Sequence, residues 1–585
     1  MHESPADKRM PLAEAIRRFV RPGMSINPSN LQPMPTAVNY ELCRQFAGRD
    51  PGFEFIASSL AGMYLPLVHL GLIRKAIVSF AGDGYPTPGP TRVVGRALGR
   101  GSFEIESWSM LTLVQRLFAG ALGLPFLPTR SLVGSSLAAE NADKGLFAEV
   151  DDPFEPGRRQ GVVRAYRPDL SLVYAWAADP AGNALMFPPH QDNVYGALAA
   201  REGAIVSAHR IVSSDFIRRH AHLVRLPGES VLAVCETPLG CHPYGNYASG
   251  IPELPSHAND YAFLRAHREA QAEEADYDAF VREWILDLED HDAYLARLDE
   301  PRVRRLYAMA EPESWREELE EHAETLDEDR PANPVEQMVV QASRVVAERV
   351  RSGGYRTLLS GVGQATLMAW LAAQRLRDQG IELAMMAETG MYGHDPRPAD
   401  PFLLNFRNLP TTTALTDILE TLGIHGAGAA NRCLATIGAG EIDRHGNVNS
   451  SVGRDGRFLT GSGGANDIVT AARETVVVAA QRPQTFVEKV GYVTSPGERI
   501  RCVVSTLGRF EKLDGDELVL TGYFDDGRPP DEVVEEIRGR CGWELRVAGE
   551  LEALPPASAE ELALLRVYDP ERLFLGKARP AGPKL

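Results

Sequence analysis

The sequence predicts an α/β fold built from two related open domains with largely parallel sheets. At 585 residues the chain is too long for a single hydrophobic core, so two or more domains are expected. The stretch from Gly354 to Gly390 follows a strand, turn, helix, strand pattern. A five-residue pattern, D-x-x-G-N, occurs at Asp179–Asn183 and again at Asp443–Asn447, each time after a strand-like run.

The Gly354–Gly390 stretch is the clearest single element. A strand-like run leads to the turn Gly361-Val362-Gly363, and apolar residues at helical spacing continue from Gln364 to about Arg377. A second predicted strand, Ile381 to Ala387, delivers Glu388 at its carboxyl end. Ligands of open α/β sheets bind outside the carboxyl ends of parallel strands, so this carboxylate is the first candidate for chemistry.

The two D-x-x-G-N patterns predict a duplicated architecture. Each is typical of a tight turn in which Asp and Asn bond local backbone while Gly takes a positive φ. A further strand-like run follows each turn, Ala204 to Val206 in the first half and Thr475 to Ala480 in the second. We therefore expect two copies of one α/β unit, with the active site between them.

The boundary between the halves is predicted from an acidic stretch. Glu311 to Arg330 contains ten acidic and two basic residues and ends at Pro331-Ala332-Asn333-Pro334, a helix-stop and linker signal. We interpret the acidic stretch as a solvated helix plus a tether. The predicted division is 1–325, a linker at 326–334, and 335–585.

Charge and hydropathy limit the partners. With 79 acidic and 61 basic residues the net charge is -18, which argues against nucleic acid or an anionic membrane as the main partner. The N-terminus lacks a signal pattern, and apolar runs such as Met63 to Ile73 stop short of a membrane span. We expect a soluble, cytoplasmic protein. Six cysteines without CxxC spacing indicate reduced or buried thiols rather than a zinc site or disulfides.

Three glycine-rich stretches have more than one interpretation. Gly361 to Thr366 resembles the start of a dinucleotide fingerprint and would indicate NAD-dependent oxidoreduction, but Thr366 occupies the third glycine position. Gly461 to Asp467 precedes a predicted helix, so its N–H groups could hold an oxyanion or phosphate; alternatively Asn466 or Asp467 only caps that helix. Ser79 to Pro88 is interpreted as a loop that ends a strand.

Together these motifs resemble a family I coenzyme A transferase of the glutaconate type, with the A-like and B-like subunits fused in one chain. The resemblance spans nearly the whole sequence. In the first half it rests on SFAGDGYPTPGP (79–90), EIESWSMLTLVQRLFAGALGLPFLPTRSLVGSSL (104–137), AWAADPAGNA (175–184) and HLVRLP (222–227). In the second half it rests on AETG (387–390), GEIDRHGNVNSS (440–451), GSGGANDI (461–468) and FVEKVGYVTSPG (486–497).

The resemblance implies ping-pong covalent catalysis with Glu388 as nucleophile. In such transferases the glutamate attacks an acyl-CoA thioester to give an acyl-glutamyl anhydride, which CoA converts to a glutamyl-CoA thioester; an acceptor carboxylate then takes over the CoA. The resemblance also implies acyl-CoA and carboxylic acid as substrates, coenzyme A as the only cofactor-like molecule, no metal, and a homo-oligomer, either dimer or tetramer.

Further site residues follow from the needs of this chemistry. Backbone N–H groups of Val362 and Gly363 are candidate oxyanion donors, as is the side chain of Asn27, which could equally cap the turn before Pro28. The predicted CoA-binding residues are Gly361, Gly463, Gly464, Ala465 and Asn466. The predicted substrate pocket contains Ser79, Gly82, Trp108 and Ser109, although the region of Trp108, Met110 and Phe118 could also be helix core.

Other polar residues have weaker claims. Glu104 and Glu106 would share one face of a strand, and at most one is expected to reach the site. His394 could contact substrate or lie in a loop. Arg130 could bind a substrate carboxylate or form a structural ion pair.

Two alternatives remain at the level of function. Some relatives of these transferases decarboxylate an acyl-CoA or hydrolyse a carbon–carbon bond, and Glu388 could serve as a general base in such a reaction or in acyl-CoA hydrolysis. A non-catalytic protein that binds CoA thioesters is a different class of hypothesis, which the presence of Glu388 beside its glycine turn disfavours.

Overall fold

A computed structural model of the chain describes residues 7–29, 33–323, 326 and 330–576. Contacts divide the chain into two compact units. Unit 1 comprises Met1–Thr129, Asn141–Glu311 and Phe458–Gly463, and unit 2 comprises Arg130–Glu140, Pro312–Arg457 and Gly464–Leu585. The division at 1–325, 326–334 and 335–585 stays a prediction, and residues 324–325 and 327–329 near it lie outside the described residues.

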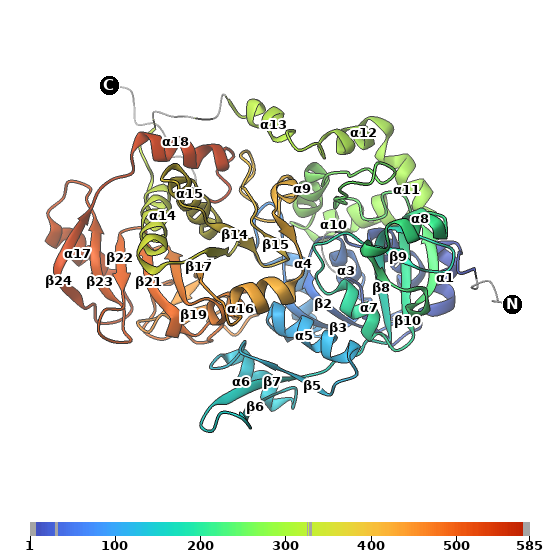
Figure 1. Cartoon of the computed structure of the whole chain (residues 1–585), viewed down its shortest axis with the longest axis horizontal. Coiled ribbons are helices and arrows are strands. Elements are labelled where there is room, and N and C mark those ends of the chain that lie inside the picture. Colours follow the sequence, from blue (N-terminus) through green and yellow to red (C-terminus); the bar gives the residue numbers. More distant parts are fainter. Residues whose placement is uncertain (1–6, 30–32, 324–325, 327–329, 577–585) are drawn as a thin grey trace. The chain divides into compact units, whose positions relative to one another are not determined.

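Unit 1 is built on a nine-stranded sheet with a parallel centre (Figure 1). Its parallel strands follow the order β12-β10-β8-β1-β2-β3-β4, and β9 and β11 add an antiparallel edge. The strands are β1 (Ser25–Asn27), β2 (Phe53–Leu60), β3 (Ile73–Ala81), β4 (Glu104–Ser107), β8 (Leu170–Ala178), β9 (Ala184–Leu185), β10 (Gly203–Ile211), β11 (Val224–Leu226) and β12 (Val231–Glu236).

Unit 2 contains a ten-stranded sheet in the order β16-β15-β14-β13-β17-β20-β21-β22-β23-β24. The strands from β14 to β21 are parallel, and antiparallel pairs extend the sheet on both sides. The strands are β13 (Thr357–Ser360), β14 (Ala384–Ala387), β15 (Met391–Tyr392), β16 (Ala414–Leu415), β17 (Cys433–Gly438), β20 (Glu474–Ala479), β21 (Ile500–Ser505), β22 (Gly508–Glu511), β23 (Val519–Phe524) and β24 (Val547–Leu554). The predicted fold class, two α/β domains with largely parallel sheets, is confirmed.

The two units repeat one strand order. β2-β1-β8-β10-β12 in unit 1 corresponds to β14-β13-β17-β20-β21 in unit 2, and every neighbouring pair in both runs is parallel. The predicted D-x-x-G-N turns match as well. In each, the last Asn donates its N–H to the Asp side chain, at 2.9 Å for Asn183 and 3.0 Å for Asn447. Each Asn then accepts the N–H of a distant glycine, Gly228 or Gly497, at 2.9 Å.

Helices cover the faces of the sheets. In unit 1 alternate residues of β8 point into two different cores: Leu170 and Leu172 join one, and Val173 and Ala175 join the other. All nine residues of β8 are buried, as expected for a central strand. The longer helices of unit 1 include α1 (Leu12–Phe19), α2 (Thr36–Phe46), α4 (Arg92–Gly99), α5 (Met110–Ala121), α7 (Asn193–Ala199), α9 (Tyr261–Ala270), α10 (Glu274–Val281), α11 (His291–Leu298) and α12 (Glu300–Ala308).

In unit 2, α14 (Pro334–Gly353), α15 (Gln364–Asp378) and α18 (Ala559–Tyr568) pack together beside the sheet (Figure 1). The acidic stretch contains a short helix, α13 (Trp315–Glu321), whose Glu318 pairs with the buried Arg407. Two further helices of this unit are α16 (Ala465–Ala471) and α17 (Pro530–Gly539).

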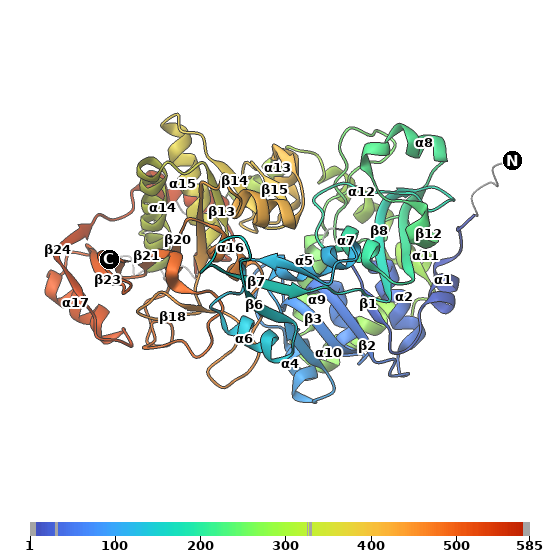
Figure 2. The same cartoon turned by 60° about the horizontal axis from the view of Figure 1, so that its bottom comes forward.

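A small antiparallel sheet of unit 1, β5-β7-β6, packs beside α5 (Figure 2). Its strands are β5 (Phe126–Thr129), β6 (Phe147–Asp151) and β7 (Arg159–Arg164). Among the helices of the described residues, none has the length and apolar content needed to cross a bilayer. All six cysteines lie in the described part of the chain as free thiols, and five of them are buried.

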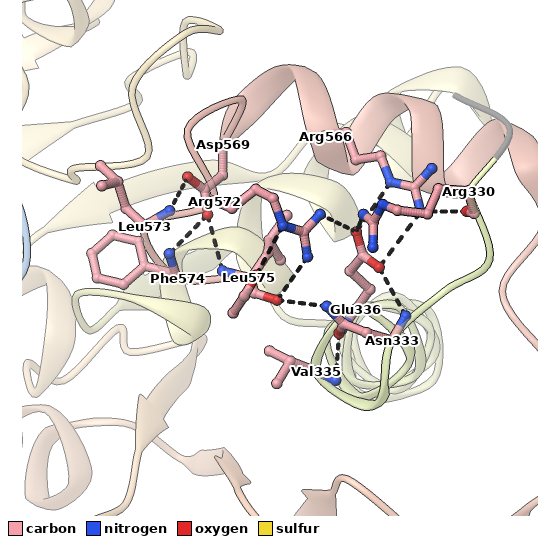
Figure 3. Close-up of polar contacts among 11 residues, drawn as sticks. Arg330, Asn333, Val335, Glu336, Arg566, Asp569, Arg572, Leu573, Phe574 and Leu575 are labelled. Atoms are coloured by element: carbon pink, nitrogen blue, oxygen red, sulfur yellow. Dashed lines mark hydrogen bonds and ion pairs between the residues drawn. The ribbon is translucent and has the colours of Figure 1, made fainter. Parts of the chain in front are cut away.

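Two buried carboxylates hold the C-terminal segment of unit 2 against α14 (Figure 3). Glu336 pairs with Arg330 at 2.7 Å, Arg566 at 3.0 Å and Arg572 at 3.1 Å. Asp569 accepts three consecutive backbone N–H groups, those of residues 573, 574 and 575, at 2.7 to 3.0 Å. The segment after α18 therefore has a defined path back toward the start of α15.

Candidate active site

Glu388 directly follows β14 and begins the turn that leads into β15. The N–H of Gly390 donates to the carbonyl of Ala387 at 3.2 Å, and Gly390 has a φ of 111°, which lets the chain reverse without side-chain strain. The Glu388 residue is 9% exposed. As predicted, a carboxylate stands at the carboxyl end of a parallel strand.

Gly464 lies against this carboxylate. A Cβ at Gly464 would be 1.8 Å from Oε2 of Glu388 and 2.7 Å from its Cδ, both far inside contact distance. Gly464 has a φ of -87°, so the requirement for glycine here is one of space and not of backbone conformation. The backbone at the start of α16 thus forms one wall around the side chain of Glu388.

Burial and the nearby negative charge of Asp467 raise the pKa of Glu388 to about 7. Asp467 lies in the first turn of α16 and is fully buried. Near neutral pH the Glu388 side chain is therefore a mixture of carboxylate and carboxylic acid. A group whose pKa is close to the working pH is suited to nucleophilic or acid–base chemistry, and such shifts are common in active sites.

The glycine-rich loop before α16 is held by backbone hydrogen bonds within unit 1. Gly463 donates its N–H to the carbonyl of Ser79 at 2.8 Å, and its own carbonyl accepts the N–H of Met110 at 3.0 Å. Ala81 donates to the carbonyl of Thr460 at 2.8 Å. The division between the units falls directly after Gly463. The loop is therefore an ordered part of the protein.

Asn466 ties two loops of unit 2 together. Its Oδ1 accepts the N–H of Leu132 at 2.8 Å, and its Nδ2 donates to the carbonyl of Thr494 at 2.9 Å. The N-cap of α16 is Gly464, so the alternative in which Asn466 or Asp467 caps this helix is wrong. The predicted CoA contacts of Ala465, the first residue of α16, and of Asn466 stay predictions.

The turn Gly361–Gly363 connects β13 to α15 as predicted. The N–H of Gly361 continues the sheet by donating to Thr436 at 2.8 Å. Gly363 is the N-cap of α15 with a φ of 93°, a conformation that favours glycine. The ring of Phe574 lies 3.6 Å from the position of a Cβ at Gly363, and Gln364 donates to the carbonyl of Phe574 at 3.1 Å. The roles of Gly361, Val362 and Gly363 toward a substrate stay predictions.

Asn27 ends β1, the strand of unit 1 that corresponds to β13. Its Nδ2 donates to the carbonyl of Ile56 at 2.8 Å, and its Oδ1 accepts the hydroxyl of Ser171 at 3.0 Å. A Cβ at Gly196 would be 1.9 Å from Oδ1, so the amide is closely packed. These contacts give Asn27 a structural role between neighbouring strands, and its role as an oxyanion donor stays a prediction.

The predicted pocket residues of unit 1 have structural contacts as well. Ser79 donates its hydroxyl to Ser58, and Gly82 faces Gly89, whose carbonyl would be 2.4 Å from a Cβ at Gly82. Ser109 caps α5 in a capping box with Thr112. Their assignment to a substrate pocket stays a prediction.

Trp108 is fully buried beneath the guanidinium of Arg116, whose Cζ is 4.1 Å from the ring centroid. Its indole donates to Glu106 at 2.8 Å. Burial opposes ionisation of Glu106, but the charges of Arg116 and Lys75 hold its pKa below the usual value. Glu106 thus belongs to a buried ion-pair cluster, whereas Glu104 is exposed.

Arg130 and His394 both lie in unit 2. Arg130 donates to the carbonyl of Ala427 at 2.9 Å, and its binding of a substrate carboxylate stays a prediction. His394 is 3% exposed, and burial lowers its pKa to about 4, so its ring is neutral at pH 7. A contact of His394 with substrate stays a prediction.

Two contributors to the site have little signal in the sequence. The charge of Asp467 raises the pKa of Glu388, although the two residues are far apart in the sequence. The only sequence feature that pointed to Asp467 was its place in the glycine-rich stretch Gly461 to Asp467. Phe574 reaches the Gly363 turn from the end of the chain, so no local periodicity indicates it. Both contacts depend on tertiary packing.

Two parts of the chain are similar in sequence to known coenzyme A transferases. Residues 9–237 match the family model described as coenzyme A transferase. Over 316 residues the chain is 29% identical to the A subunit of glutaconate CoA-transferase from Acidaminococcus fermentans, a match that covers 51% of this chain and 94% of the relative. A different part is 31% identical over 168 residues to the B subunit of the same organism's enzyme, covering 25% of this chain and 60% of the relative.

Among solved structures, an acyl-CoA transferase of Escherichia coli O157:H7 shares the fold with a TM-score of 0.65. The likeness covers 99% of both chains at 14% sequence identity. The two sequence matches, each to a different subunit type and each in a different part of this chain, fit a fusion of the two.

Proposed function

We propose that this chain, one part of which is similar to the A subunit and another part to the B subunit of glutaconate CoA-transferase, transfers CoA from an acyl-CoA to a carboxylic acid through a covalent glutamyl-CoA thioester on Glu388. The observation that carries the proposal is the buried Glu388 carboxylate at the end of β14, walled by Gly464 and with its pKa raised to about 7.

In the first half-reaction a carboxylate oxygen of Glu388 attacks the thioester carbon of the acyl-CoA. The C–S bond breaks, CoA leaves as the thiolate, and an acyl-glutamyl anhydride remains. The thiolate then attacks the glutamyl carbon of the anhydride. This step releases the donor as a free carboxylate and leaves CoA bound to Glu388 as a thioester.

The second half-reaction reverses these steps with a different acid. The acceptor carboxylate attacks the glutamyl-CoA carbon and displaces the CoA thiolate, which attacks the acceptor's carbonyl and regenerates the Glu388 carboxylate. No proton or electron is gained or lost overall. A glutamyl anhydride is as activated as a thioester, so little free energy is lost at each exchange.

Burial of the side chain suits both halves of this chemistry. A closed environment protects the anhydride from hydrolysis, and it makes the carboxylate a better nucleophile than it would be in bulk water. Raising the pKa of Glu388 to about 7 still leaves a substantial ionised fraction at neutral pH. The tetrahedral oxyanion needs donors, and we assign this role to the N–H groups of Val362 and Gly363 at the start of α15.

The proposal is tested by trapping the intermediate. The protein is incubated with a panel of acyl-CoAs without acceptor and treated with borohydride or hydroxylamine, and modified peptides are mapped by mass spectrometry. We expect a reduced glutamate or a hydroxamate at Glu388. Glu388→Gln abolishes labelling and CoA exchange, whereas Glu382→Gln, an exposed residue just before β14, changes neither.

The raised pKa of Glu388 also favours a second candidate function. A carboxyl group that titrates near pH 7 can act as a general base, and Glu388 could then serve an acyl-CoA hydrolase, a decarboxylase or a carbon–carbon bond hydrolase on this fold. An acyl-CoA that is cleaved or decarboxylated without any labelling of Glu388 would establish this alternative and overturn the transferase proposal.

A further inference from the structure

A polar cavity of about 730 Å³ lies in unit 1; its lining includes none of the residues predicted to form the substrate pocket, although two lining residues, Glu106 and Arg116, contact Trp108. It opens at the amino-terminal ends of the parallel strands: Ser25 begins β1, Glu54 is near the start of β2, and Asp169 directly precedes β8. Asn27 and Gly82, by contrast, stand at or just past the carboxyl ends of β1 and β3. Lys75, at the cavity, is about 13 Å along β3 from Ser79.

The carboxylates that line the cavity already have partners in the protein. Glu106 pairs with Lys75 at 2.7 Å and with Arg116 at 3.0 Å. Asp169 accepts the backbone N–H and the hydroxyl of Ser25, both at 2.9 Å. Glu54 accepts the hydroxyl of Tyr166. The acidic groups therefore do not need an external cation.

The basic groups exceed the acidic ones. Six basic residues line the cavity, namely Lys75, Lys144 and the arginines at positions 116, 164, 167 and 201, against three acidic residues, Glu54, Glu106 and Asp169, which leaves a formal charge of +3. Among the described residues, Lys144, Arg164 and Arg167 form no ion pair with a carboxylate. Such a surplus is notable in a chain whose net charge is -18.

The fold positions the side chain of Arg167 and the backbone of Arg164. Arg167 donates its Nε to the carbonyl of Ala199 at 3.1 Å, which fixes the guanidinium and leaves its terminal nitrogens for a ligand. The carbonyl of Arg164 accepts Nε of the buried Arg116 at 3.0 Å, which fixes the backbone at the end of β7. Cations gathered without anionic partners repel one another, so a bound anion would relieve that cost.

We propose that this cavity binds a small polyanion that carries phosphate groups. The volume is in the range that holds a molecule of metabolite size. Planar guanidinium groups bind phosphate oxygens in pairs, and three uncompensated cations match the charge of a diphosphate. This site is separate from the CoA-transfer chemistry proposed for Glu388 and does not depend on it.

The test is calorimetric titration of the full-length protein with pyrophosphate. We expect binding that weakens steeply as salt is added. The double variant Arg164→Ala/Arg167→Ala should bind at least tenfold more weakly. Arg159→Ala, at the other end of β7 and outside the cavity, should bind like the wild type. Because all three arginines are exposed, the variants should keep the wild-type unfolding temperature.

Three outcomes would overturn the proposal. One is the absence of heat with pyrophosphate at low salt. A second is equal binding by wild type and double variant, which would place the ligand elsewhere, including at the predicted CoA site. A third is binding of succinate as tight as that of pyrophosphate, which would indicate a dicarboxylate site and not a phosphate site.

Discussion

The backbone of Gly464 and the carboxylate of Glu388 are in direct contact, and a methyl group at Gly464 would be 1.8 Å from Oε2. A side chain that is positioned by backbone has little freedom to shift when its neighbour changes. The position of the proposed nucleophile therefore depends on residue 464 being glycine.

Gly464→Ala should displace the Glu388 side chain and lower the rate of CoA transfer by roughly 100-fold, since a misplacement of about 1 Å can cost that much. The measurement is the steady-state rate together with the yield of labelled Glu388. Gly491→Ala is the matched control, because Gly491 has open space around it and no left-handed φ. Wild-type activity in Gly464→Ala would contradict the close contact.

The pH dependence of transfer should follow the ionisation of Glu388. Only the carboxylate is a nucleophile, so the rate should rise with pH through about 7, the pKa to which burial and Asp467 raise this group. Asp467→Asn removes one of these causes and should move the midpoint to lower pH. The profile is measured as kcat/KM against pH for both proteins. A midpoint that is unchanged in Asp467→Asn would show that Asp467 does not act on Glu388 by charge.

The same raised pKa has a consequence for stability. In the unfolded chain Glu388 returns to an ordinary pKa near 4.5, so between about pH 4.5 and 7 the folded protein binds more protons and loses stability as pH rises. Glu388→Gln lacks this loss. The free energy of unfolding of Glu388→Gln minus that of the wild type should therefore increase by about 3 kcal/mol when the pH is raised from 4.5 to 8, because one pKa unit is about 1.4 kcal/mol.

Urea denaturation at both pH values measures this difference. Glu382→Gln, an exposed residue, is the control and should show no such trend. If the stability difference between Glu388→Gln and wild type does not change with pH, Glu388 titrates at its ordinary pKa.

Local patterns in the sequence predicted much of this fold. The helix predicted from Gln364 to about Arg377 is α15, Gln364–Asp378, and both D-x-x-G-N turns form with the expected hydrogen bonds. The strand predicted from Ile381 begins only at Ala384, because that is the residue that pairs with Thr357 at the start of β13. Strand length is thus set by the partner strand, which a local pattern does not contain.

The site was predicted less completely, for a related reason. The position of Glu388 follows from strand order alone. By contrast, the contacts of Asn27 with Ile56 and Ser171, and the stacking of Arg116 on Trp108, depend on which elements become neighbours. Polar residues that looked available for substrate in the sequence are used by the fold to connect its strands and helices.

Glu336 is a clear case of such a connection, since it is fully buried and forms ion pairs with three arginines around α14 (Figure 3). Glu336→Ala would remove from the buried Arg566 the carboxylate that it pairs with at 3.0 Å. Removal of one member of a buried ion pair typically costs 3–5 kcal/mol, so we expect a loss of about that size in chemical denaturation. Glu348→Ala, on the exposed face of the same helix, should cost less than about 0.5 kcal/mol. Equal effects of the two variants would contradict a structural role for the cluster.

Phe574 links the C-terminal segment to the chemistry proposed for the Gly363 turn. Asp569 holds residues 573–575, and the Phe574 ring then rests against Gly363, whose N–H we assign to the oxyanion. Phe574→Ala removes this support while leaving Glu388 in place. Because oxyanion donors act in the transition state, kcat should fall about tenfold or more with KM nearly unchanged.

Steady-state kinetics over both substrates test this, with thermal unfolding to show that unit 2 stays folded. Phe154→Ala is the matched control, since Phe154 is 91% exposed and in unit 1. A rise in KM at constant kcat would instead mean that the segment contributes to substrate binding. An unchanged rate would remove Phe574 from the mechanism and would weaken the assignment of the Gly363 N–H as a donor.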